Sequence, residues 1–242
     1  MLSDILVKIQ SLSSLQKRSL VVFDLDSTLF DVSPRLERIL LDFAAMPLNH
    51  RRFPEQVALL KNIKTLRSDW GITGALTRAG LDGHHMDFQE AIKAYWLKNF
   101  FSNHYLQFDA PYEGAIEFVQ AVQKAGAEIA YLTGRDVERM GIGTEEVMRQ
   151  WEFPVDETSH LVLKPHRSMD DAEFKTNWFV EAAKKGFEKI YFFENEPVNV
   201  VHLRERCPQV EIIFFESTHA GKAIPPEDIP RIMNFLLNQK ES

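Results

Sequence analysis

The chain has 242 residues, of which 45% are hydrophobic and 26% charged, and its formal net charge is −7. This size allows one large domain or two smaller ones, whereas the acidic balance argues against a nucleic-acid-binding surface that works by bulk charge. No apolar run approaches the roughly 20 residues that cross a bilayer, and the single cysteine, Cys207, rules out an internal disulfide. We therefore expect a cytoplasmic protein without a membrane partner, and no feature of the sequence indicates an oligomeric state.

The first part of the chain predicts one helix, one strand and then a run of helices. Residues 1–16 carry apolar side chains at helical spacing, and the apolar run Leu20–Phe23 predicts a strand covered on both faces. Residues 31–109 carry three further helical stripes with no strand-like run between them. The stripes are Leu36, Ile39, Leu40 and Phe43; Leu59, Ile63, Leu66 and Trp70; and Phe88, Ala91, Ile92, Tyr95 and Trp96. Trp70, Tyr95 and Trp96 are expected in the core of this segment or at a substrate entrance.

After residue 110, short apolar runs alternate with helical patterns. The runs 128–132, 160–163, 190–193 and 211–215 predict strands, and helices are expected between them and after Pro225–Pro226. This rhythm predicts an α/β fold with a doubly wound parallel sheet. Residues 1–30 and 110–242 would form the core domain, and residues 31–109 an inserted all-helical domain. Ligands of such sheets bind beyond the carboxyl ends of the strands.

Asp24 and Asp26 stand at the end of the first predicted strand. Two carboxylates so close together repel each other, and a hard divalent cation such as Mg²⁺ relieves the repulsion. One carboxylate could then attack phosphorus while the other protonates the leaving oxygen, and Thr28 could hydrogen-bond within the loop. The alternative interpretation is a solvated turn followed by a helix cap.

The run Val21–Leu29 resembles the first motif, D-x-D-x-[TV], of the haloacid dehalogenase-like superfamily, and Ile129–Arg135 resembles its second motif. The resemblance covers residues 20–215 and places the helical segment where this superfamily inserts a cap. It implies a Mg²⁺-dependent phosphatase in which Asp24 forms an aspartyl-phosphate and Asp26 transfers the proton. Thr133 would hold a phosphoryl oxygen. The implied substrate-binding residues are Thr28, Thr133, Gly134 and Arg135, although Arg135 could equally pair with a carboxylate.

The remaining two motifs of the superfamily match less closely. Its lysine is either Lys175, which we prefer because it precedes Glu194 by a typical spacing, or Lys164 at a strand end. Its acidic loop is represented by Glu194-Asn195-Glu196, where Asn195 replaces a second acid and removes one negative charge. The implied ligands of Mg²⁺ are Asp24, Asp26, Glu194 and Asn195.

Several alternatives stay open at this point. Asp26 favours phosphate chemistry over dehalogenation, since halide leaves without a proton. A phosphatase, in which water is the final phosphoryl acceptor, is favoured over a phosphomutase. The altered acidic loop also allows a catalytically weak or inactive binding or regulatory protein. A small phosphorylated metabolite is the expected partner, but the sequence does not identify which one. His219 follows the last predicted strand without an assigned role, and His84-His85 is interpreted as part of a turn rather than a metal cluster.

Overall fold

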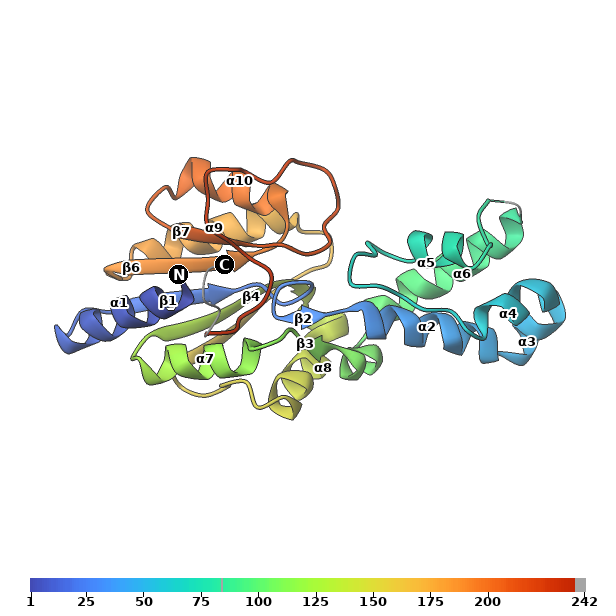
Figure 1. Ribbon diagram of the computed structural model, residues 1–242, viewed down its shortest axis with the longest axis horizontal. Helices are drawn as coiled ribbons and strands as arrows, with labels where there is room; N and C mark the ends of the chain where they lie inside the picture. Colours follow the sequence, from blue (N-terminus) through green and yellow to red (C-terminus); the bar gives the residue numbers. More distant parts are fainter. Residues whose placement is uncertain (84, 238–242) are drawn as a thin grey trace.

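The computed structural model describes residues 1–83 and 85–237, so His84 lies outside the described residues. It contains a parallel sheet covered by helices on both faces and a group of helices that projects from one end of this core (Figure 1). No helix within these two ranges is both long enough and apolar enough to cross a membrane.

The main sheet has six strands in the order β5-β4-β1-β6-β7-β8, and every neighbouring pair is parallel. The strands are β1 (Ser19–Phe23), β4 (Glu128–Asp136), β5 (Ser159–Lys164), β6 (Lys189–Glu194), β7 (Glu211–Phe215) and β8 (Arg231–Ile232). The prediction of a doubly wound parallel sheet is therefore confirmed. Because β1 lies between β4 and β6, the ends of these three strands are neighbours.

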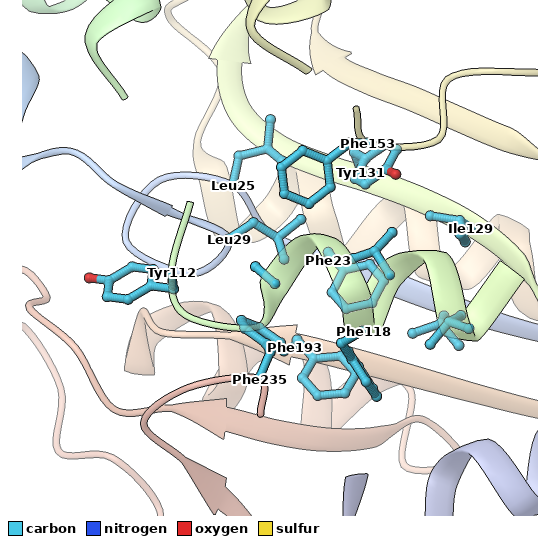
Figure 2. Close-up of a cluster of buried hydrophobic side chains, with 14 of the residues drawn as sticks. Phe23, Leu25, Leu29, Tyr112, Phe118, Ile129, Tyr131, Phe153, Phe193 and Phe235 are labelled. Carbon is cyan, nitrogen blue, oxygen red and sulfur yellow. The ribbon is translucent and has the colours of Figure 1, made fainter. Parts of the chain in front are cut away.

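Alternate residues of β1 enter two separate cores. Phe23 points into the first core, beneath α1 (Leu2–Ser14), α7 (Ala115–Lys124) and α8 (Val137–Gln150). Figure 2 shows this core, in which Phe23 stacks on Phe193 with ring centroids 5.0 Å apart. Val22 points into the second core, beneath α9 (Asp171–Ala183) and α10 (Pro197–Arg206). Burial on both faces explains why β1 is a continuous apolar run.

The end of the described chain differs from the sequence-based prediction. A helix was expected after Pro225–Pro226, but residues 225–237 contain no helix and instead supply the sixth strand, β8, beside β7. Phe235 is fully buried and stacks on Phe215 at 5.1 Å between ring centroids. Burial of this ring in the first core (Figure 2) outweighs the local helical tendency of the segment.

The projecting group of helices, residues 33–108, is called the helical insert below. It contains α2 (Ser33–Ala45), α3 (Pro47–Arg52), α4 (Pro54–Leu60), α5 (Thr73–Arg78), α6 (Met86–Phe100) and a 3₁₀ helix (Asn103–Phe108). Its apolar side chains form a third core of their own. The insert joins the sheet through the short antiparallel pair β2 (Phe30–Asp31) and β3 (Ala110–Pro111). The domain boundaries at residues 30/31 and 109/110 stay a prediction.

One of the three predicted helical stripes is wrong. The stripe that ended in Leu66 and Trp70 breaks after α4, and both residues lie in the connection to α5, where they are exposed. The carboxylate of Asp69 accepts a hydrogen bond from the Leu66 backbone N–H at 2.8 Å, and Gly71 adopts a φ of +72°. This local turn satisfies backbone groups that a continuous helix would have used.

Candidate active site

The carboxyl ends of β1, β4 and β6 meet at a cavity of about 350 Å³ between the sheet and the helical insert. Phe23, the last residue of β1, is in register with Tyr131 of β4 and Phe193 of β6. The residues that follow these three positions therefore lie close together at one edge of the sheet. The residues that both line this cavity and belong to the predicted site are Asp24, Asp26, Thr133, Gly134, Arg135, Lys175, Glu194 and Asn195.

Asp24 is held by the backbone and by one buried hydroxyl. Its N–H donates to the carbonyl of Phe193 at 3.0 Å, which continues the sheet by one residue. The chain then turns sharply through Ser27, whose φ is +62°. This turn brings the Thr28 hydroxyl within 3.0 Å of the Asp24 carboxylate and of the Asn195 side-chain oxygen. Thr28 is fully buried, so this position orients Asp24 from beneath the cavity.

Lys175 joins the two acids at the centre of the site. Its Nζ lies 2.5 Å from Asp24 Oδ1 and 2.7 Å from Glu194 Oε2, and the side chain is buried. Burial alone would lower the pKa of Lys175, but the two carboxylates raise it above its usual range. Lys164 is placed differently, since its ammonium group contacts Asp171 and the Met169 carbonyl. The geometry therefore supports the preference for Lys175 over Lys164.

The site contains more carboxylate groups than the single positive charge of Lys175 can neutralise. Burial raises the pKa of Asp24 to about 7, and repulsion by Glu194 and Asp26 adds to this rise while Lys175 opposes it. Both oxygens of Glu194 accept two hydrogen bonds each, from the N–H groups of Asn195 and Glu196 and from Lys175 and Asn199. A cation at this position would favour the ionised form of Asp24.

Glu196 is a site residue to which the sequence assigned no role of its own. Its Oε2 accepts a hydrogen bond from the Ala220 N–H at 2.9 Å, whereas its buried Oε1 has no partner among the described residues. The side chain also lines the cavity. A buried carboxylate oxygen without a donor is costly, and a bound cation or its water would satisfy it.

The donor set fits Mg²⁺ although it is not a closed cage. Within residues 1–83 and 85–237, no three acidic, histidine or cysteine side chains converge as a ready-made metal cluster. Mg²⁺ usually takes only one or two carboxylates and completes its octahedron with waters and substrate phosphate oxygens. The Asp24 carboxylate, with its raised pKa, and the unpartnered oxygen of Glu196 are the features that suit such an ion.

Asp26, whose side chain is partly buried, belongs to a network of four charges in which the other three side chains are buried. Its Oδ1 accepts hydrogen bonds from Arg35 Nη2 at 2.9 Å and Arg135 Nε at 3.0 Å. The same two arginines also bind Asp109, at 2.6 and 2.7 Å. Burial alone would raise the pKa of Asp26, but Arg135 and Arg35 together lower it below its usual range. Asp26 is therefore ionised in this arrangement.

Two members of this network, Arg35 and Asp109, were missed by sequence reasoning. Both side chains are fully buried, Arg35 at the start of α2 and Asp109 just before β3. They lie 74 residues apart, so no local spacing connects them. Arg35 directly precedes Leu36, the first residue of a predicted helical stripe. An arginine beside an apolar stripe was the only sequence feature that could have indicated a buried cation here. Arg135, by contrast, was predicted to bind substrate or to pair with a carboxylate, and in the structure it pairs with two.

Thr133, Gly134 and His219 complete the cavity wall. The buried Thr133 hydroxyl accepts the Arg135 N–H at 3.2 Å and keeps its own proton available as a donor. A Cβ at Gly134 would lie 2.7 Å from the Asp171 carboxylate, so a larger residue there would require this half-exposed side chain to shift. His219 lines the cavity from the loop after β7, and its Nδ1 accepts the Gly221 N–H at 3.1 Å. That contact gives His219 a structural role in its loop.

Known proteins share this fold at low sequence identity. Protein tyrosine kinase A from Mycobacterium tuberculosis matches with a TM-score of 0.54 and 15% identity, over 89% of this chain and 94% of that one. Two superfamily hydrolases, from Ehrlichia chaffeensis and Geobacter sulfurreducens, each match with a TM-score of 0.51 and 14% identity, over 90% of this chain and 93% of theirs. At these identities the likeness concerns the fold.

Family membership follows from the sequence itself. No curated protein matches the chain. The family model for haloacid dehalogenase-like hydrolase matches residues 19–169, more than half of the chain, and this range includes both Asp24 and Thr133. The chain belongs to the haloacid dehalogenase-like hydrolase family.

Proposed function

We propose that this protein is a Mg²⁺-dependent phosphatase that hydrolyses a small phosphate monoester through an aspartyl-phosphate on Asp24. The observation that carries the proposal is the placement of Asp24. It lies at the carboxyl end of β1, faces the cavity, and is held by Lys175 on one oxygen and Thr28 on the other. A carboxylate fixed in this way can present one oxygen to phosphorus without losing its orientation.

Two residues are placed to receive the phosphoryl group beside Asp24. The Thr133 hydroxyl would donate to one phosphoryl oxygen, and the Lys175 ammonium group would offset the charge that gathers during transfer. Mg²⁺, when bound, would be held by Asp24, the Asp26 backbone carbonyl and the acidic loop of Glu194 and Glu196. It would neutralise charge on the phosphate.

The proposed reaction has two steps. First, an oxygen of Asp24 bonds to phosphorus, and the bond from phosphorus to the alcohol oxygen breaks with its electron pair going to the alcohol, which takes up a proton. Second, water attacks the aspartyl-phosphate, the bond to Asp24 breaks, and the carboxylate and inorganic phosphate are restored. Asp26 is the group that would give up the first proton and accept the proton of the water.

The role of Asp26 carries a condition that the sequence did not suggest. A carboxylate paired with Arg35 and Arg135 is ionised and has no proton to donate. Arg35 lies on α2 of the helical insert, whereas Arg135 lies on β4 of the sheet. We infer that a shift of the insert relative to the sheet loosens the Arg35 contact and so weakens one of the two pairings that keep Asp26 ionised. Proton transfer by Asp26 requires the Arg135 contact to weaken as well.

The direct test is hydrolysis of 4-nitrophenyl phosphate with Mg²⁺. Asp24→Asn should abolish turnover, because the amide oxygen is a poor nucleophile, while circular dichroism shows an unchanged fold. Asp82→Asn is a matched control, since Asp82 is an exposed aspartate of the helical insert. Full activity in Asp24→Asn would overturn the mechanism.

One observation favours a second candidate, a binding or regulatory protein with little turnover. Both carboxylate oxygens of Glu194 are already saturated by hydrogen bonds from the protein, and Asp26 is fixed by two arginines. Such a protein would bind Mg²⁺ weakly and would release no phosphate from a panel of phosphate monoesters. Phosphate release that depends on both Mg²⁺ and Asp24 would exclude it.

A further inference from the structure

The cavity beside Asp24 has two chemically different walls. The wall at the carboxyl edge of the sheet is polar and contains Asp24 and Thr133, together with Lys175 from α9. The wall from the helical insert is mainly apolar, with Asp69 as the one charged residue among its described members; its apolar members are Leu36, Trp70, Trp96, Leu97, Phe100 and Phe101. The volume of about 350 Å³ lies in the range of small-ligand sites, so the cavity holds more than a phosphate group.

The aromatic part of this apolar wall is fixed before any ligand enters. The Arg35 guanidinium lies 4.4 Å from the centroid of the Phe100 ring, and the Arg139 guanidinium lies 5.1 Å from that of Phe101. The two phenylalanine rings meet edge to face at 5.0 Å between centroids. Cation–π and edge-to-face contacts hold such rings in defined orientations. A ligand therefore meets a preformed aromatic surface.

Trp70 extends this surface toward the mouth of the cavity, although 59% of it is exposed. The loop that carries it is fixed by the adjacent Asp69, whose carboxylate binds the Leu66 N–H and the Arg78 guanidinium. Gly71, on the other side, lies against Trp96, since a Cβ there would be 3.4 Å from the Trp96 ring. A large indole that is carried on a fixed loop and left open to water gains most when a ligand covers it.

The lysine and arginine side chains of the cavity wall are already paired with carboxylates within the protein. Lys175 binds Asp24 and Glu194, Arg135 binds Asp26 and Asp109, and Asp69 binds Arg78. Among the described residues that line the cavity, no Lys or Arg lacks a carboxylate partner. A second anionic group on the substrate would find no free lysine or arginine there. The several hydroxyls of a sugar would meet mainly apolar side chains on the insert wall, whose available donors are indole N–H groups such as Trp96 Nε1, which has no partner among the described residues.

We propose that the apolar wall binds the alcohol part of the substrate and selects an uncharged aromatic group that stacks against Trp70 and Phe100. The orientation of this group relative to phosphate rests on the proposed function, because the phosphate would sit beside Asp24. A quaternary ammonium group would also be attracted to aromatic faces, but Phe100 and Phe101 already lie against the guanidinium groups of Arg35 and Arg139, and the Asp69 carboxylate is paired with Arg78. We therefore expect an uncharged aromatic group to be preferred over a cation.

A binding experiment tests this subsite without requiring turnover. Isothermal titration calorimetry with Mg²⁺ present would compare benzylphosphonate with methylphosphonate, which share the phosphonate but differ in the aromatic group. We expect benzylphosphonate to bind at least about tenfold more tightly, and Trp70→Ala to remove most of this difference while methylphosphonate binding is unchanged. Trp70→Phe should restore most of the difference. Leu59→Ala, an exposed apolar residue of α4 away from the cavity, is the control.

Turnover provides the second arm of the test. Benzyl phosphate, glucose 6-phosphate and phosphocholine are all esters of primary alcohols, so a difference in kcat/KM among them reports mainly recognition. The proposal expects benzyl phosphate to be preferred. A preference for the sugar or the quaternary ammonium ester, or equal binding of the two phosphonates, would overturn it. Selective binding of benzylphosphonate without hydrolysis of any ester would support the subsite and overturn the proposed phosphatase function alone.

Discussion

Replacement of Arg35 by methionine should destabilise the protein more than any change on the exposed side of the same helix. Arg35 is fully buried and makes two hydrogen bonds to Asp109, at 2.6 and 2.7 Å, and one to Asp26, at 2.9 Å. Its removal leaves the buried carboxylate of Asp109 and the partly buried carboxylate of Asp26 with Arg135 as their remaining cation. Loss of one partner from a buried ion pair costs about 3–5 kcal/mol, and we expect the lower end because Arg135 stays.

The expected magnitude can be measured by urea unfolding and by thermal unfolding. A loss of about 3 kcal/mol in the free energy of unfolding corresponds to a decrease of roughly 6–12 °C in Tm for a chain of this size. Arg38→Met is the matched control on α2, because Arg38 is half-exposed and forms a surface ion pair with Asp42 four residues later. Such surface pairs contribute about 0–1 kcal/mol, so the control should change little.

A double variant separates the charge effect from lost packing. Arg35→Met combined with Asp109→Asn restores a net charge of zero to the buried network, which retains Asp26 and Arg135. We expect the double variant to be no less stable than Arg35→Met alone, which requires a coupling energy between the two sites at least as large as the loss caused by Asp109→Asn alone. The reasoning would be refuted if Arg35→Met lost less than about 1 kcal/mol, or if the two single losses simply added.

Three further predictions follow from individual contacts. Gly143→Ala in α8 should lower the free energy of unfolding by about 1–3 kcal/mol, because a Cβ there would lie 2.5 Å from the Asn103 carbonyl. Gly141→Ala in the same helix meets no atom closer than 3.7 Å, so it should be neutral or stabilising. Equal unfolding free energies for the two variants would contradict this reasoning. Lys175→Met should lower kcat for 4-nitrophenyl phosphate about 10²–10³-fold with Mg²⁺ present, and a decrease below tenfold would remove Lys175 from the proposed mechanism. Asp26→Asn should slow hydrolysis of an alkyl phosphate more than that of 4-nitrophenyl phosphate, since nitrophenolate leaves without a proton, and an equal decrease in both rates would argue against proton transfer by Asp26.

The local sequence determined the sheet and the position of the site. Continuous apolar runs such as Leu20–Phe23 indicate strands buried on both faces, and parallel strands place the residues that follow them along one edge. Asp24, Thr133 and Glu194 each end or follow such a run, so their convergence at one cavity could be predicted from short segments. The spacing between Lys175 and Glu194 identified the lysine that contacts Asp24.

Packing overrode the local pattern at two places in the chain. The segment after Pro225 forms β8 and buries Phe235, and the stripe through Leu66 and Trp70 is a loop rather than a helix. In both segments the spacing of apolar residues is compatible with a helix, and it does not reveal which partner each side chain will meet. Contacts from distant parts of the chain decide such cases.

Only the tertiary structure decided the electrostatic environment of Asp26. The sequence identified Asp26 as a carboxylate two residues after Asp24, and its chemistry suggested a proton donor. Arg35 and Arg135 come from segments separated by a hundred residues, and folding brings them together around Asp26 and Asp109. The protonation state of a carboxyl group depends on its burial and on nearby charges, and both are properties of the folded chain.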